Sequence, residues 1–136
     1  MLPGIASHPQ VLLAMRDSTM VPSWVNEVHG RLRLAGLSVY RAYPGLDCIE
    51  RLQRGGVAAA VLWAEADPGD GLGMLRMIRS VDLNLPCWLV LEDATPGTLR
   101  AAFALRARSV MTQPVDVGAL SFSLTRTLAV TRRSEH

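Results

Sequence analysis

Four acidic residues could hold a divalent cation. Asp17, Glu65, Asp67 and Glu92 each follow a stretch that is typical of a buried strand. Open α/β sheets bind ligands at the carboxyl ends of their strands, and hard cations such as Mg²⁺ prefer carboxylate oxygens. No recognisable ligand spacing links the four residues, and acidic residues on loops are usually solvated. A shifted metal site is therefore the alternative, and we expect no metal and no other cofactor.

Side chains that could support nucleophilic catalysis are scattered along the chain. The serines that we considered, Ser18, Ser109 and Ser121, have no adjacent histidine with a residue to orient it. His8 and His29 are isolated, which is typical of surface residues. All 14 basic residues are arginine, which excludes Schiff-base catalysis and a phosphate-binding P-loop lysine. The sequence therefore predicts no catalytic residue and no enzyme.

Both cysteines, Cys48 and Cys87, lie within apolar patterns and lack the spacing of a metal site. This placement favours two reduced, buried thiols. Reduced thiols are typical of the cytoplasm, which is the location we predict.

Size and composition indicate one globular domain over residues 1–136. Hydrophobic residues make up 49% of the chain and charged residues 19%, as in a compact protein with a sheet buried on both faces. The formal net charge of +2 is too small to favour nucleic-acid binding. No signal peptide is apparent, and the longest apolar run, residues 57–64, is far shorter than the ~20 residues of a membrane span.

Five apolar stretches with strand character alternate with five amphipathic helical patterns. We expect strands at 11–15, 37–40, 57–63, 85–91 and 110–112, with a loop at 65–71. The helices should begin near Pro22, Leu46, Leu72, Pro96 and Asp116, the fourth burying Leu99, Ala102 and Phe103. Such alternation predicts an α/β fold, a flavodoxin-like (βα)5 three-layer sandwich with the parallel strand order 2-1-3-4-5.

Three landmarks resemble the receiver domain of two-component response regulators, the CheY-like superfamily. They are Asp70-Gly71-Leu72 at a helix start, Leu85-Pro86 before the fourth strand, and Gln113-Pro114 after the fifth. The two prolines at the last two landmarks are 28 residues apart, which needs no gap against the family. The resemblance implies Mg²⁺-dependent transfer of a phosphoryl group to an aspartate that ends the third strand.

The family's phosphorylation residues are replaced in this chain. Trp63, seven residues before Asp70, stands at the acceptor position, Leu91 stands where a threonine or serine belongs, and Gln113 replaces the lysine. Met15-Arg16-Asp17 replaces the consecutive acids after the first strand. The resemblance therefore implies a degenerate phosphorylation pocket, formed by Met15, Arg16, Asp17, Trp63, Leu91 and Gln113, in a pseudo-receiver.

Two of these replacements have two interpretations each. Trp63 either fills the vacated pocket, which we favour, or lines a small-molecule pocket. Gln113 either serves the geometry of a turn at Pro114, with a cis peptide as in receivers, or marks a pocket no longer built for phosphate. The alternatives for the whole chain are a flavodoxin-like domain that binds a small ligand or metal, and a receiver with displaced phosphorylation chemistry.

The fourth helix, the fifth strand and the fifth helix form the face through which receivers commonly pair. We expect a homodimer through this face and place six residues there: Arg100, Arg106, Arg108, Asp116, Leu120 and Leu124. Residues 112–116, Thr-Gln-Pro-Val-Asp, are also similar to the N-terminal pseudo-receiver of amidase-type RNA-binding antiterminator regulators. The predicted role is a regulatory module that contacts a protein partner or output domain, with no direct contact to nucleic acid or membrane.

Overall fold

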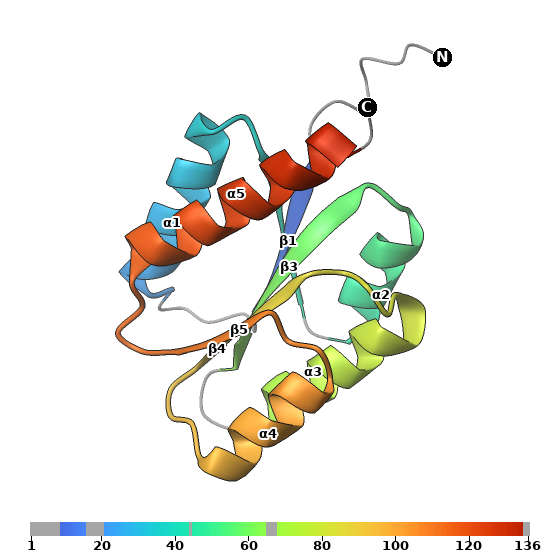
Figure 1. Ribbon diagram of the computed structural model, residues 1–136, viewed down its shortest axis with the longest axis vertical. Coiled ribbons are helices and arrows are strands. Elements are labelled where there is room, and N and C mark those ends of the chain that lie inside the picture. The colour runs from blue at the N-terminus through green and yellow to red at the C-terminus, as the bar shows by residue number, and fades with distance from the viewer. Residues whose placement is uncertain (1–8, 16–20, 44, 65–67, 135–136) are drawn as a thin grey trace.

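The computed structural model describes residues 9–15, 21–43, 45–64 and 68–134, which form a five-stranded parallel sheet between two helical layers (Figure 1). The strands are β1 (Gln10–Ala14), β2 (Ser38–Ala42), β3 (Val57–Ala64), β4 (Cys87–Leu91) and β5 (Ser109–Thr112). The helices are α1 (Ser23–Leu34), α2 (Leu46–Gln53), α3 (Pro68–Val81), α4 (Pro96–Ala104) and α5 (Val117–Ser134). The strand order is β2-β1-β3-β4-β5, which confirms the predicted flavodoxin-like fold.

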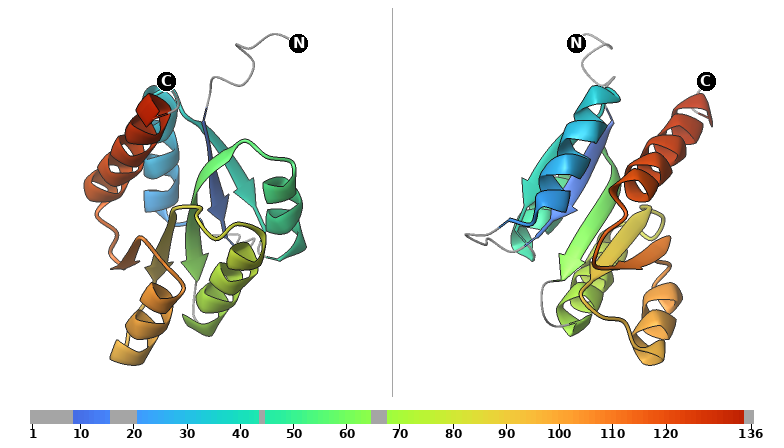
Figure 2. Two further views of the ribbon diagram at one scale, coloured as in Figure 1. Left: turned by 45° about the vertical axis from the view of Figure 1, so that its right-hand side comes forward. Right: turned by 90° about the vertical axis from the view of Figure 1, so that its left-hand side faces the viewer.

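The central strands are buried on both faces because helices cover both. Helices α1 and α5 pack against one face, and α2, α3 and α4 cover the other, as the turned views of Figure 2 show. Side chains alternate along each strand, so Val61 and Trp63 belong to the α1/α5 core, whereas Ala60 and Leu62 belong to the other. This double burial explains the unbroken apolar sequence of β3.

Local capping chemistry begins two of the helices where the sequence predicts. The Thr95 hydroxyl oxygen accepts a hydrogen bond from the Thr98 amide at 3.1 Å at the start of α4. The Asp116 carboxylate accepts one from the Ala119 amide at 2.9 Å at the start of α5. Such caps satisfy amide donors that have no partner inside the helix.

Two local predictions were wrong. Helix α3 begins at Pro68, so it occupies part of the predicted 65–71 loop, which agrees with the preference of proline for a first helical turn. On α4, Phe103 is 52% exposed and only Ala102 of the predicted face is fully buried. The helix is short and its apolar positions run almost around its circumference, so the pattern does not define one face. None of the described helices is long and apolar enough to cross a membrane.

Candidate functional site

Residues Trp63, Leu91 and Gln113 meet at the carboxyl edge of the sheet. In the strand register, Trp63 lies beside Val90, and Leu91 lies between Ala64 and Thr112. The backbone N–H of Gln113 donates a hydrogen bond to the backbone carbonyl of Leu91 at 3.1 Å. The backbone therefore places the three substituted positions on three neighbouring strand ends.

The side chains of Trp63 and Leu91 belong to opposite faces of the sheet. Trp63 packs in the α1/α5 core, together with Met15 of the predicted pocket. Leu91 is fully buried in the core under α2, α3 and α4. Because neighbouring strands are in register and Trp63 and Leu91 differ by one position, their side chains point opposite ways. Leu91 therefore does not close a common pocket around the indole.

Trp63 is buried against a second tryptophan. Its side chain is 5% exposed, and its ring meets that of Trp24 from α1 edge to face, with centroids 5.9 Å apart and planes at 85°. Edge-to-face contacts between aromatic rings are favourable beyond the area that they bury. Within the described residues, neither indole Nε1 has a hydrogen-bond acceptor. This packing supports the interpretation in which Trp63 fills space over the one in which it lines an open pocket.

The residues described at this edge do not fit the magnesium ion that receivers use. An indole N–H is a hydrogen-bond donor and a leucine side chain has no oxygen, whereas Mg²⁺ takes oxygen ligands. Among the described residues, no group of three histidine, cysteine, aspartate or glutamate side chains could hold a metal. Glu92 is exposed just after β4. Arg16, Asp17, Glu65 and Asp67 lie outside the described residues, so their predicted places stay predictions.

The turn after β5 has the geometry expected from the receiver resemblance. The peptide bond between Gln113 and Pro114 is cis. Gln113 is half-buried, and its backbone amide extends the contact with β4 beyond the last paired residue of β5. The structure thus confirms the turn geometry. The second interpretation, in which the Gln113 side chain marks a pocket no longer built for phosphate, stays a prediction.

Both cysteines are free and buried, as predicted. The Cys48 thiol donates to the Tyr43 carbonyl at 3.0 Å and the Cys87 thiol to the Leu85 carbonyl at 3.3 Å. Burial raises the pKa of each thiol to about 11, with a smaller contribution from Asp47 at Cys48. Because the thiolate is the nucleophile, neither cysteine is suited to catalysis near neutral pH.

Two of the six predicted interface residues were wrongly placed. Leu120 and Leu124 are 0% exposed and pack into the α1/α5 core, so they are not available to a partner. An apolar stripe on a helix marks a buried face, and here α5 uses its stripe to cover the sheet.

The other four predicted interface residues, Arg100, Arg106, Arg108 and Asp116, are exposed. Two of them already have contacts within the chain. The Arg108 guanidinium carbon lies 5.9 Å from the ring centroid of Trp88, and the Asp116 carboxylate caps α5.

Sequence reasoning missed a polar cluster between α1 and β2. Arg41 of β2 donates from Nε to His29 Nδ1 at 3.2 Å and from Nη2 to Asn26 Oδ1 at 2.9 Å. His29 is therefore not isolated, although it lies at the surface as expected. The only available signal was the i, i+3 spacing of Asn26 and His29, because the contact to Arg41 depends on how the strand pairs.

Solved structures share this fold at low sequence identity. The signal receiver domain of a putative Luxo repressor protein from Vibrio parahaemolyticus is 17% identical, with a TM-score of 0.75, covering 94% of this chain and 95% of its own. Chemotaxis response regulator CheY4 of Vibrio cholerae is 20% identical, with a TM-score of 0.69 and coverages of 88% and 98%. A CheY-like receiver domain protein from Methanospirillum hungatei JF-1 is 12% identical, with a TM-score of 0.72 and coverages of 93% and 98%.

No family model matches the sequence, and a search of curated proteins finds no match. The structural matches span nearly the whole of both chains. The chain therefore has the fold of CheY-like response-regulator receiver domains.

Proposed function

We propose that this chain is a phosphorylation-independent pseudo-receiver, a regulatory module that acts by contact with protein partners and catalyses no reaction. The observation that carries the proposal is the burial of Trp63 against Trp24 at the exit of β3. An active receiver needs a carboxylate nucleophile at that position, and an indole provides none.

The neighbouring positions support the same proposal. Leu91 offers no hydroxyl, and the neutral amide of Gln113 replaces a cation that would stabilise negative charge on a phosphoryl group. The receiver fold is the fold of two-component signalling proteins, so we place the module in bacterial signal transduction or transcription control, in the cytoplasm. Its contacts would be with a protein partner or an output domain, and not with nucleic acid or membrane.

Treatment with acetyl phosphate and Mg²⁺ tests this proposal. We expect no acid-labile phosphate on the intact chain by mass spectrometry. Beryllofluoride with Mg²⁺ should leave the tryptophan fluorescence unchanged, since Trp24 and Trp63 would report a ligand at this edge. The DrrB receiver domain, which has been solved in a beryllofluoride-activated form, is the positive control for the beryllofluoride treatment.

A phosphoryl group on Asp17 or Asp67 would overturn phosphorylation independence and favour displaced receiver chemistry. A fluorescence change with Mg²⁺ alone would instead favour a metal site among the acidic residues of this edge.

We further propose that the module forms a homodimer through α4, β5 and α5. Strand β5 is an edge strand of the sheet. Arg100 of α4 and Arg106 of the connection to β5 are exposed. Under two-fold symmetry, arginines of one copy would face Asp116 of the other. The half-exposed Phe103 of α4 adds apolar surface near these charges.

Charge reversal tests the homodimer. Sedimentation velocity should show a dimer for the wild type and a monomer for Arg100→Glu with Arg106→Glu, because like charges would then oppose one another across the interface. Arg54→Glu is the control and should remain dimeric, because Arg54 is exposed just after α2, which contacts β2 at the edge of the sheet opposite β5. A wild type that is monomeric at all tested concentrations would contradict this interface.

A further inference from the structure

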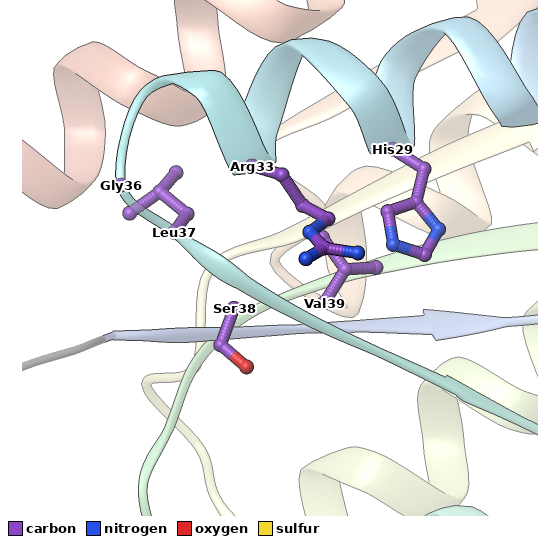
Figure 3. A pocket seen from close by; sticks show the side chains of 6 residues that line it. All are labelled: His29, Arg33, Gly36, Leu37, Ser38 and Val39. Carbon is purple, nitrogen blue, oxygen red and sulfur yellow. The ribbon is translucent and has the colours of Figure 1, made fainter.

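A shallow pocket of about 350 Å³ lies between α1 and β2. Its lining residues are His29 and Arg33 from α1, Gly36 and Leu37 from the connection, and Ser38 and Val39 from β2. Figure 3 shows the His29 imidazole and the Arg33 guanidinium side by side, facing the strand that carries Ser38 and Val39. Ser38 begins β2, so the pocket starts at the opposite end of the sheet from Trp63.

The polar groups of this pocket are mainly hydrogen-bond donors. Because Arg41 Nε donates to His29 Nδ1, that nitrogen is an acceptor and the imidazole proton resides on Nε2. The second bond of Arg41, to Asn26, holds the arginine in place. Arg33 adds a guanidinium, which presents several N–H donors in a plane that matches phosphate oxygens.

The positive charge around the pocket is not neutralised within the described part of the chain. The pocket has no acidic lining residue, and no ion pair of Arg33 or Arg41 with a carboxylate is present among the described residues. The pKa of His29 is lowered by burial first and then by the positive charges of Arg41 and Arg33. No carboxylate contributes to this shift.

We propose that the pocket between α1 and β2 binds a small phosphate ester. Arg33 and His29 would contact the phosphate group, and Val39 would contact the apolar part of the ester. The pocket is separate from the edge of the sheet that holds Trp63. A test of phosphate binding therefore does not depend on the proposed function.

Binding of an anion should be coupled to protonation of His29. The charged imidazole carries its second proton on Nδ1, which replaces the bond accepted from Arg41 Nε. The two arginines oppose this charge, and a bound phosphate would offset their effect and favour the charged form. By linkage, affinity should then rise as the pH falls through the pKa of His29. Sulfate is the probe for this measurement, because its charge does not change between pH 5 and 8.

The experiment is an NMR titration of the intact chain with phenyl phosphate, inorganic phosphate and sulfate. Chemical shifts of the His29 ring and of the amides of residues 36–39 should change in a saturable way. Arg33→Gln should weaken binding about tenfold, as expected for the loss of one charge-assisted contact. Arg31→Gln is the matched control, because Arg31 is on the same helix, carries the same charge and does not line the pocket.

The outcomes separate a built site from general attraction to arginine. Three results together would support the proposal. The chemical-shift changes are saturable and confined to the pocket, phenyl phosphate binds more tightly than inorganic phosphate, and sulfate binds more tightly at pH 5 than at pH 8. Equal weakening in the two variants, or unsaturable shifts near all exposed arginines, would overturn it. His29→Gln keeps a donor but cannot titrate, so it should bind sulfate with no pH dependence.

Discussion

Replacing Trp63 with alanine is expected to lower the free energy of unfolding by about 3–5 kcal/mol. The indole is 5% exposed and belongs to the α1/α5 core. Its removal leaves a cavity and deletes the edge-to-face contact with Trp24. Urea unfolding followed by circular dichroism measures the loss, as a lower midpoint at an unchanged slope.

Phenylalanine substitutions distinguish the role of this ring from that of another buried tryptophan. Trp63 Nε1 has no hydrogen-bond acceptor among the described residues, so Trp63→Phe loses volume but removes an unsatisfied donor. Trp88 Nε1 donates to Ser123 Oγ at 3.0 Å, so Trp88→Phe also loses a hydrogen bond. We expect Trp63→Phe to cost less than Trp88→Phe. An alanine variant of Trp63 as stable as the wild type would refute the space-filling role.

A tryptophan at this position has a consequence for regulation. Receivers respond to a chemical input at the end of the third strand, and an indole fixed in the core leaves that position no chemical state to change. Under the proposed function, the module would favour one packed arrangement, and its regulation would come from what binds it. The separate pocket between α1 and β2 is one place where a small molecule could supply that input.

The fold could be predicted from the sequence because the apolar strand patterns and the helix-capping residues indicated the same order of elements. The apolar run of residues 57–63 and the capping residues Thr95 and Asp116 marked element ends that the structure confirms. Short connections between alternating elements then leave few topologies for a parallel sheet. Phe103 was misplaced because a nine-residue helix with apolar residues on several sides has no single preferred face.

The candidate site was only partly predictable. Spacing from Asp70 placed Trp63 at the end of β3, where the structure has it. That Leu91 belongs to the opposite face depends on the register between β3 and β4, which spacing within one strand does not determine. Leu120 and Leu124 were assigned to an interface because an apolar stripe alone does not distinguish a core from a contact surface.

Arg79 makes an extensive set of side-chain hydrogen bonds that nothing in the sequence indicated. Arg79 lies in the last turn of α3, where a basic residue usually stays in solvent and complements the helix dipole. It is instead only 9% exposed. Its guanidinium donates to four backbone carbonyl groups: Leu105 at 2.8 Å, Asp82 at 3.1 Å, Leu85 at 2.8 Å and Arg106 at 3.0 Å.

These bonds join the end of α3 to the connections before β4 and after α4. Arg106 adopts a positive φ of 63° in the second of these connections, a conformation that is unfavourable for most residues. The guanidinium thus holds a strained turn next to β5, and it gives four backbone carbonyl groups a charged hydrogen-bond donor.

Replacing Arg79 with methionine should therefore lower the free energy of unfolding by about 3 kcal/mol, because several carbonyl groups lose a donor while the apolar stem is kept. Lysine should restore only part of this loss, since one ammonium group cannot reach all four acceptors. Arg76→Met is the matched control: Arg76 is exposed on the same helix, and its replacement should change stability by less than about 0.5 kcal/mol. Urea midpoints measure all three variants. If Arg79→Met and Arg76→Met proved equally stable, the four bonds would contribute nothing to the fold, and the turn at Arg106 would have to be held by its own backbone contacts.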